Sequence, residues 1–270
     1  MELGEIGIWR LRRHGVEGVD EIEALGYSAL WLGGSPATAD ARPYLEATSA
    51  MTIATGILNV WQHEPAEAAA GYRELAREFP GRFLLGIGIG HPEATSDYTR
   101  PLATMRAFFD GLDEGGVPEQ ERIAAALGPK MLDLARERSL GAHTYFVTPE
   151  HTKVARERLG PDAAIAAEVA VVVETDTDEA RRIAREYARG YLARRNYTSN
   201  LLRIGFTEDD VANGGSDRLI DAVIPHGSAD DIAHHVRPHL NAGATHVCLQ
   251  PLGHGPHPAD DYRALAHALL

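Results

Sequence analysis

The chain alternates short apolar runs with longer amphipathic stretches, a rhythm that is typical of repeated strand and helix units. Some runs, such as FLLGIGI and AAIAAEVAVVV, are continuously apolar, as expected for strands that are buried on both faces. The predicted strands are residues 3–9, 28–32, 51–60, 82–89, 122–126, 143–147, 165–173 and 245–250.

The stretches between these runs carry helix signals. Pro65 stands near the start of PAEAAAGYRELAREF, and Pro80-Gly81 follows the end of that segment. Gly128-Pro129 opens KMLDLARERSLG, and Thr148-Pro149 opens EHTKVARERLG. The sequence therefore predicts that helices follow the strands.

Eight strands, each followed by helical sequence, in a chain of 270 residues predict an α/β fold, the (β/α)8 TIM barrel. A doubly wound open sheet is the alternative. Residues 196–224 contain LLRIGFTEDD and SDRLIDAV and no clear strand, so we expect a short helical insertion there, before the last strand. With no internal repeat, low-complexity segment or linker, residues 1–270 are expected to form a single domain.

Charge and cysteine content narrow the class of protein. Against 39 Asp and Glu stand 26 Lys and Arg, a net charge of −13, which argues against a nucleic-acid or anionic-membrane partner. The single cysteine, Cys248, excludes an intramolecular disulfide and a cysteine-built zinc site, and it is more typical of core than of a nucleophile. The first residues do not resemble a signal peptide, and no run of about 18 apolar residues occurs. We therefore expect a cytoplasmic enzyme that acts on a small molecule.

In a barrel, functional residues gather at the C-terminal ends of the strands. Glycine there lets a ligand approach the backbone, while His and Trp offer proton transfer and a stacking surface. Simple turns are the alternative interpretation of the same residues. The rule nominates Gly33-Gly34-Ser35, residues 59–63, residues 88–91, Leu127–Lys130 and residues 148–151.

Two of these segments resemble phosphate-binding motifs. GIGIG at 86–90 lacks the G-x-G-x-x-G spacing of a dinucleotide site, and a flat ring lying against its backbone is the favoured interpretation. At Gly128-Pro129 a helix start would leave N–H groups free from Lys130 onward to bind an anion, with an ordinary capped helix as the alternative. His235 and His239 are four residues apart but lack a third ligand, so no metal site is predicted.

Five segments, GYSALWLGGSP, TGILNVWQHEPAE, PGRFLLGIGIGHPE, AALGPKMLDLA and YFVTPEHT, follow the order found in the luciferase-like monooxygenase superfamily. The chain, from Leu3 to Gln250, most resembles the actinobacterial branch of coenzyme F420-dependent oxidoreductases. The resemblance implies a barrel with an insertion, usually a homodimer, and a deazaflavin or flavin ring at the C-terminal mouth. It also implies a non-proline cis peptide in the third strand, at Gly56-Ile57 or Ile57-Leu58.

The resemblance also assigns site residues. Trp61 and His63 would form a substrate wall, and the helix start at Gly128–Met131 would hold the cofactor phosphate. The cofactor-binding residues would be Gly33, Ser35, Gly56, Ile57, Asn59, Gly88, Gly90, Gly128, Pro129, Lys130, Met131 and Thr148.

The chain departs from its relatives where their acid–base pair lies. Relatives often have an acidic residue and a histidine after the second strand, and a glutamate after the fourth-strand glycines. The replacement candidates for catalysis are His91, Glu93 and His63, with Ser35 as a further one to test. The resemblance implies hydride transfer between the deazaflavin of F420 and an unidentified small organic substrate. An FMN-dependent monooxygenase and a non-catalytic ligand- or cofactor-binding barrel remain alternatives.

Overall fold

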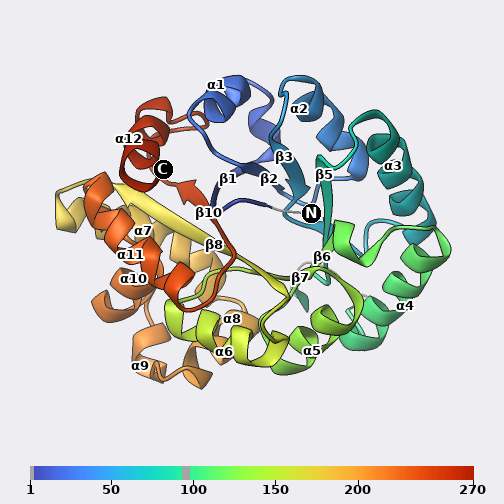
Figure 1. The fold of residues 1–270 in the computed structure, drawn as a ribbon. Helices are drawn as coiled ribbons and strands as arrows, with labels where there is room; N and C mark the ends of the chain where they lie inside the picture. Colours follow the sequence, from blue (N-terminus) through green and yellow to red (C-terminus); the bar gives the residue numbers. More distant parts are fainter. Residues whose placement is uncertain (1–2, 93–97) are drawn as a thin grey trace.

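A computed structural model describes residues 3–92 and 98–270. Its parallel strands close into a barrel, because β10 pairs with β1 on one side and with β8 on the other (Figure 1). This closure confirms the predicted TIM barrel and excludes the open sheet. The barrel strands are β1 Ile6–Leu11, β2 Ala29–Gly33, β3 Thr52–Thr55, β5 Phe83–Gly88, β6 Arg122–Ala125, β7 Gly141–Thr144, β8 Ala164–Val173 and β10 His246–Pro251.

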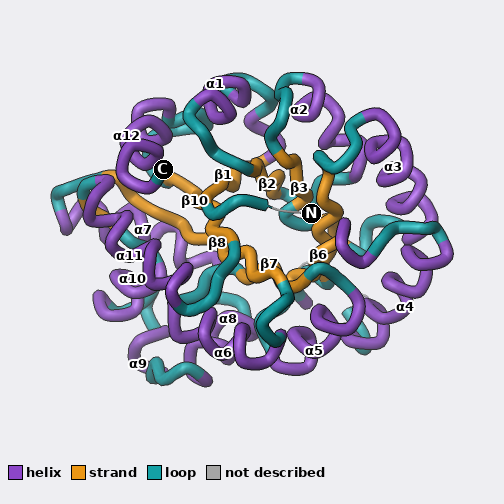
Figure 2. Tube along the Cα trace, in the orientation of Figure 1, coloured by secondary structure: helices purple, strands orange, loops and turns teal. Residues whose placement is uncertain are grey.

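Helices surround the barrel on its outer side (Figure 2). Proline opens α3, α5 and α6, as the sequence predicts, since its missing N–H has no partner in the first turn of a helix. No helix in the described part of the chain is both long and apolar enough to cross a membrane. The surrounding helices are α1 Val19–Ala24, α2 Arg42–Glu46, α3 Pro65–Glu78, α4 Pro101–Glu114, α5 Pro129–Arg138, α6 Pro149–Leu159, α7 Thr177–Leu192, α11 Ala229–Asn241 and α12 Ala259–Leu269, with short 3-10 helices η1 Arg12–His14, η2 Thr38–Ala41 and η4 Glu119–Glu121.

The third predicted strand, 51–60, is interrupted. β3 ends at Thr55, and β4 Leu58–Asn59 resumes pairing with β5. The pairing offset falls from 84 − 54 = 30 to 87 − 58 = 29, so one extra residue bulges out of this strand. The peptide bond between Gly56 and Ile57 is cis, which confirms the first of the two expected positions.

Apart from the interrupted third strand, two strands differ from their predicted bounds by more than one residue at an end. The strand predicted at 143–147 is β7, which ends at Thr144 because Phe146 has a positive φ of 54° that no strand residue adopts. The strand predicted at 3–9 begins only at Ile6, because Gly4 has a φ of 68°. In both cases the apolar run extends beyond the strand.

The region 196–224 contains helices and precedes the last strand of the barrel. It contains most of α8 Arg195–Arg203, together with α9 Glu208–Val211 and α10 Asp217–Val223, and it precedes β9 His226–Gly227, which pairs with the end of β8. β8, ten residues long, reaches past the barrel toward these helices (Figure 1). There Ala170 and Val172 join a hydrophobic core with residues of α7, α8 and α10 that is separate from the main core between barrel and helices.

The barrel interior holds a third, smaller core. It includes Trp9, Trp31, Ala166 and Cys248. Cys248 is fully buried there, and burial raises the pKa of its thiol, so this residue is part of the core, as the sequence suggests.

Candidate active site

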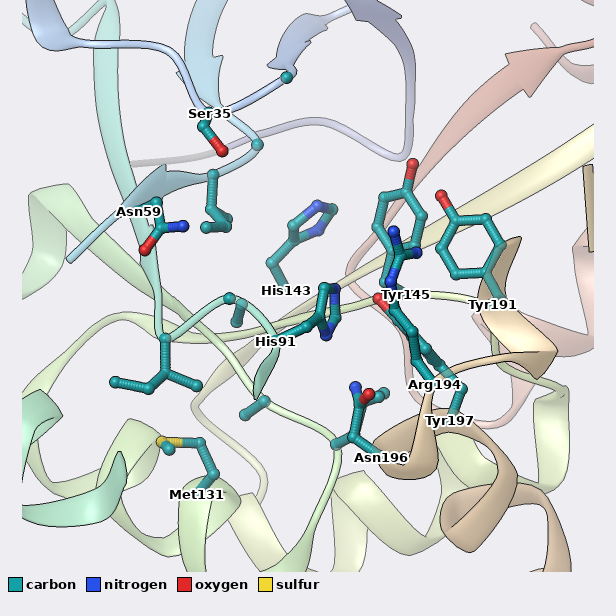
Figure 3. A pocket seen from close by; sticks show the side chains of 18 of the residues that line it. Ser35, Asn59, His91, Met131, His143, Tyr145, Tyr191, Arg194, Asn196 and Tyr197 are labelled. Carbon is teal, nitrogen blue, oxygen red and sulfur yellow. The ribbon is translucent and has the colours of Figure 1, made fainter. Parts of the chain in front are cut away.

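A cavity of about 520 Å³ opens where the chain leaves the C-terminal ends of the barrel strands. Its size falls in the range of small-molecule sites, roughly 300–1,000 Å³. Figure 3 shows Ser35, Asn59 and Met131 on one side of it and a group of tyrosines with Arg194 on the other. The cavity therefore has a wall made by strand ends and a wall made by helices α7 and α8 with the segment between them.

Many of the predicted site residues meet at this cavity, and others lie away from it. Those that line it are Ser35, Gly56, Ile57, Asn59, Gly90, His91, Gly128 and Met131. Those that do not line it are Gly33, Gly88, Pro129, Lys130, Thr148, Trp61 and His63. Glu93 lies outside the described residues.

Two predicted glycines that lie behind the wall shape it through their neighbours. A Cβ on Gly33 would come within 1.9 Å of the Trp9 ring, and one on Gly88 would come within 2.8 Å of the Ile57 side chain. Because Trp9 and Ile57 line the cavity, a side chain at either glycine would displace the wall. These glycines leave room for the Trp9 and Ile57 side chains and do not line the cavity themselves.

Trp61 also acts from outside the cavity. Its indole N–H donates to the carbonyl of Ile89 at 2.7 Å, which ties the segment after β4 to the segment after β5. Ile89 lines the cavity, whereas Lys130 is exposed and His63 is half-buried away from the cavity. Trp61 and His63, which are predicted to form a substrate wall, therefore do not line this cavity.

A stack of aromatic rings forms the floor. The His143 ring lies on Trp31 with centroids 4.3 Å apart and an angle of 17° between planes. Trp31 donates its indole N–H to His246 Nε2 at 3.0 Å, and His246 in turn bonds the carbonyl of Gly4. Burial lowers the pKa of both histidines to about 4, so both are neutral at pH 7. The hydrogen bonds of this stack fix the floor as a rigid, uncharged surface.

The orientation of His143 follows from one hydrogen bond. Its Nδ1 lies 2.9 Å from the carbonyl oxygen of Ala166, and because a carbonyl only accepts, Nδ1 carries the proton. Nε2 is then an acceptor, and it is without a hydrogen-bond partner in the described part of the chain. His143 therefore presents acceptor character beneath the cavity that it lines.

The second wall is aromatic. Phe146 and Tyr191 are stacked at 4.8 Å, Tyr197 meets Tyr191 edge-on at 4.9 Å, and the Arg194 guanidinium lies 5.7 Å from the Tyr191 ring centre. Pairs of this geometry add about 0.5–1.5 kcal/mol each to the packing. The His91 ring, 5.3 Å from that of Tyr197, joins this wall to the strand-end side.

Sequence reasoning missed the second wall together with the floor. Tyr191, Arg194 and Tyr197 are spaced at steps of three, but α7 ends at Leu192 and α8 begins at Arg195, so this spacing does not place them on one helical face and could not have found the wall. Gly34, Gln62, Ile89 and Leu127 line the cavity and lie in the nominated strand-end segments, whereas the missed lining residues are Trp9, Leu11, Tyr98, Ala125, Ala126, His143, Tyr145, Tyr191, Arg194, Asn196 and Tyr197.

No cluster of three or more His, Cys, Asp or Glu side chains that could hold a metal ion occurs among residues 3–92 and 98–270. His235 is exposed and bonds the carbonyl of Asp231, whereas His239 is buried and lies 2.9 Å from the Thr152 hydroxyl. The two histidines of the i,i+4 pair thus have separate partners.

Comparison with known proteins finds similarity to one family in part of the chain. Residues 11–114 match the family model described as luciferase-like monooxygenase. The 5,10-methylenetetrahydromethanopterin reductase of Archaeoglobus fulgidus is 25% identical over 261 residues, which cover 76% of this chain and 79% of the reductase.

Solved structures share the whole fold at low sequence identity. An F420-dependent secondary alcohol dehydrogenase in complex with an F420-acetone adduct superposes with a TM-score of 0.78 at 16% identity, covering 100% of this chain and 98% of that one. The coenzyme F420-dependent tetrahydromethanopterin reductase of Methanopyrus kandleri gives 0.74 at 15% identity, covering 100% and 99%. The oxygenating constituent of 3,6-diketocamphane monooxygenase from Pseudomonas putida, in complex with FMN, gives 0.66 at 17% identity, covering 98% and 96%.

Proposed function

We propose that this chain, a member of the luciferase-like monooxygenase superfamily, is a coenzyme F420-dependent oxidoreductase that transfers a hydride between the deazaflavin ring and a small organic substrate. The observation that carries the proposal is the cavity at the barrel mouth, with one wall of backbone and apolar side chains and another of tyrosines. The two walls suit a flat ring on one side and an organic substrate on the other.

The strand-end wall fits a ring and its phosphate. Ile57, Ile89 and Gly90 offer apolar atoms and exposed backbone to a planar group. Gly128 is the residue before the first turn of α5, and a Cβ built there would meet nothing within 4 Å. A ligand phosphate can therefore approach the N-terminus of α5, where the helix dipole favours an anion.

When bound, the deazaflavin would supply the carbon that gives or accepts the hydride. The chain's own residues would position the reactants and exclude water. The apolar wall would support one face of the ring, and Tyr191 and Tyr197, which line the opposite side of the cavity, would pack against the substrate. His91, which lies between the two walls, is the proposed proton partner (Figure 3).

Titration of the purified protein with F420 and, separately, with FMN tests the proposal. We expect F420 to bind tightly and FMN weakly or not at all. The reverse order of affinities would favour an FMN-dependent monooxygenase. The oxygenating constituent of 3,6-diketocamphane monooxygenase, solved in complex with FMN, shares this fold. Binding of neither would overturn both activities and favour a non-catalytic barrel.

A charge placed at the start of α5 provides the matched test of the phosphate site. Gly128→Asp adds a carboxylate next to the expected phosphate, so we expect F420 affinity to fall at least about tenfold, or about 1.4 kcal/mol. Gly190→Asp is the control, because a Cβ at this exposed position of α7 likewise meets nothing within 4 Å. Equal affinities of the two variants would refute the assignment of the phosphate.

The resemblance further implies a pair of chains, and we propose a homodimer on that basis. Sedimentation equilibrium is expected to give twice the chain mass of 29.2 kDa.

A further inference from the structure

The carboxyl group of Glu168 is buried inside the barrel without a charged partner. Its side chain is 1% exposed, and no Lys, Arg or His within the described residues lies close enough to form an ion pair with it. Among the described residues, two groups reach it: the Phe146 N–H donates at 3.5 Å, and the Tyr187 hydroxyl oxygen lies 3.4 Å away. A buried carboxylate so weakly bonded is costly, so the neutral acid is favoured, and burial raises the pKa of Glu168 to about 8. Glu168 therefore carries a proton at pH 7.

A chain of phenols leads from this acid to the site. The Tyr187 and Tyr145 hydroxyls each lie 2.9 Å from the side-chain oxygen of Gln250, and they are 3.4 Å from each other. Because an amide oxygen only accepts, both phenols donate to Gln250. The Tyr187 oxygen then keeps its lone pairs free for the proton of Glu168.

The two ends of this chain open into different cavities. Tyr145 lines the cavity of about 520 Å³ described above, and Tyr187 lines a second one of about 500 Å³. The second cavity is also lined by Glu174, Glu179 and Glu186, by Arg182, which pairs with Glu179 and Glu186, and by His254, so its lining is polar and holds more carboxylate than guanidinium groups. Glu168 thus lies beside a hydrogen-bonded path that joins a polar, acidic cavity to the candidate active site.

We propose that Glu168, Tyr187 and Tyr145 form a proton relay between these two cavities. The proposal rests on the proposed function, since hydride transfer to a carbonyl group leaves an oxyanion that must accept one proton. Tyr145 gives its proton to that oxygen and takes the proton of Tyr187, which takes the proton of Glu168. Water in the second cavity then re-protonates Glu168 through Tyr187. One proton has moved from water to the product, both phenols are restored, and oxidation of an alcohol runs the same steps in reverse.

Among the titratable groups that face Glu168, none titrates near neutral pH, so Glu168 is the group of this cluster that does. They are the phenols of Tyr145, Tyr187, Tyr191 and Tyr197 and the thiol of Cys248. Burial raises the pKa of each, that of Tyr191 to about 12, so all are neutral at pH 7. Gln250 is a positioning residue that holds the two phenols together.

Infrared spectroscopy of the protein without coenzyme tests the relay. We expect a carbonyl band of a protonated carboxylic acid that is lost as the pH rises through about 8 and that is missing in Glu168→Gln. On transfer into D2O this band shifts as the carboxyl proton exchanges. Tyr187→Phe is expected to slow that exchange at least tenfold. Tyr145→Phe is the matched control: it also removes one phenol from Gln250, but it leaves the path to the second cavity intact.

Two results would overturn the relay: absence of the carboxylic acid band at pH 7, or exchange in Tyr187→Phe at the wild-type rate. These measurements need no coenzyme, so they decide the relay even if F420 fails to bind. On the F420-loaded enzyme, Glu168→Gln and Tyr145→Phe are expected to lower kcat about tenfold or more at pH 7 with KM within twofold. An unchanged kcat would contradict delivery to the active site.

Discussion

Replacing Glu168 by Gln should change how the stability of the protein depends on pH. In the folded chain the pKa of Glu168 is about 8, against a reference value of 4.5. Between these two pKa values the folded chain binds more protons than the unfolded chain. The stability that the protonated Glu168 contributes is therefore fully present below pH 4.5 and is lost as the pH rises through about 8. At about 1.4 kcal/mol per pH unit, this group removes roughly 4 kcal/mol between pH 5 and pH 9. Glu168→Gln abolishes that loss.

Urea unfolding at pH 5, 7 and 9, followed by tryptophan fluorescence, measures the effect. We expect the free energy of unfolding of Glu168→Gln, relative to wild type, to rise by about 4 kcal/mol across this range. Glu157→Gln removes an exposed carboxylate on α6, and its difference from wild type should stay constant. Parallel pH profiles of wild type and Glu168→Gln would refute the neutral state of the buried acid, because no other ionisable group differs between the two proteins.

Further predictions concern the wall, the candidate proton partner and one buried arginine. Gly88→Ala should push Ile57 into the cavity and weaken F420 binding at least about tenfold, which the same titration measures. His91→Ala should slow turnover more than it weakens coenzyme binding, and unchanged turnover would remove His91 from the catalytic residues. The Asp113 carboxylate lies 2.6 Å from the fully buried guanidinium of Arg122. Asp113→Asn removes this ion pair and should lower the free energy of unfolding, measured in urea, by about 1–3 kcal/mol. Since Arg122 and Arg138 lower the pKa of Asp113, the wild-type protein should lose this contribution in acid, as the pH falls through that lowered pKa.

The strands could be predicted because they are buried on both faces. In β5 and β8 each side chain faces either the barrel interior or a helix. Strands of this kind produce the continuous apolar runs that the sequence displays. The strand-end half of the site followed from the same rule, since the C-terminal ends of parallel strands converge. Ser35, Asn59, His91 and Gly128 meet at the cavity for that reason.

The rest of the site depends on contacts between distant segments. Tyr145 meets Gln250 across 105 positions of sequence, and Tyr187 meets Glu168 through the packing of α7 on β8. A glutamate within an apolar run could be recognised from sequence as unusual, but its partners could not. Periodicity defines which face of α8 is apolar, and only tertiary packing brings Tyr197 to the cavity.

The two walls of the cavity rest on two different hydrophobic cores among the three that the described residues form. Ile89 and Met131 rest on the main core of the barrel, whereas Tyr191 and Tyr197 rest on the core shared by α7, α8 and α10. Substitutions in the second group alter what the cavity admits without repacking the barrel, because they strain a different set of contacts. Laboratory evolution toward a new substrate should therefore accumulate changes at 187–224, and a coenzyme preference acquired once can persist while the substrate range diverges.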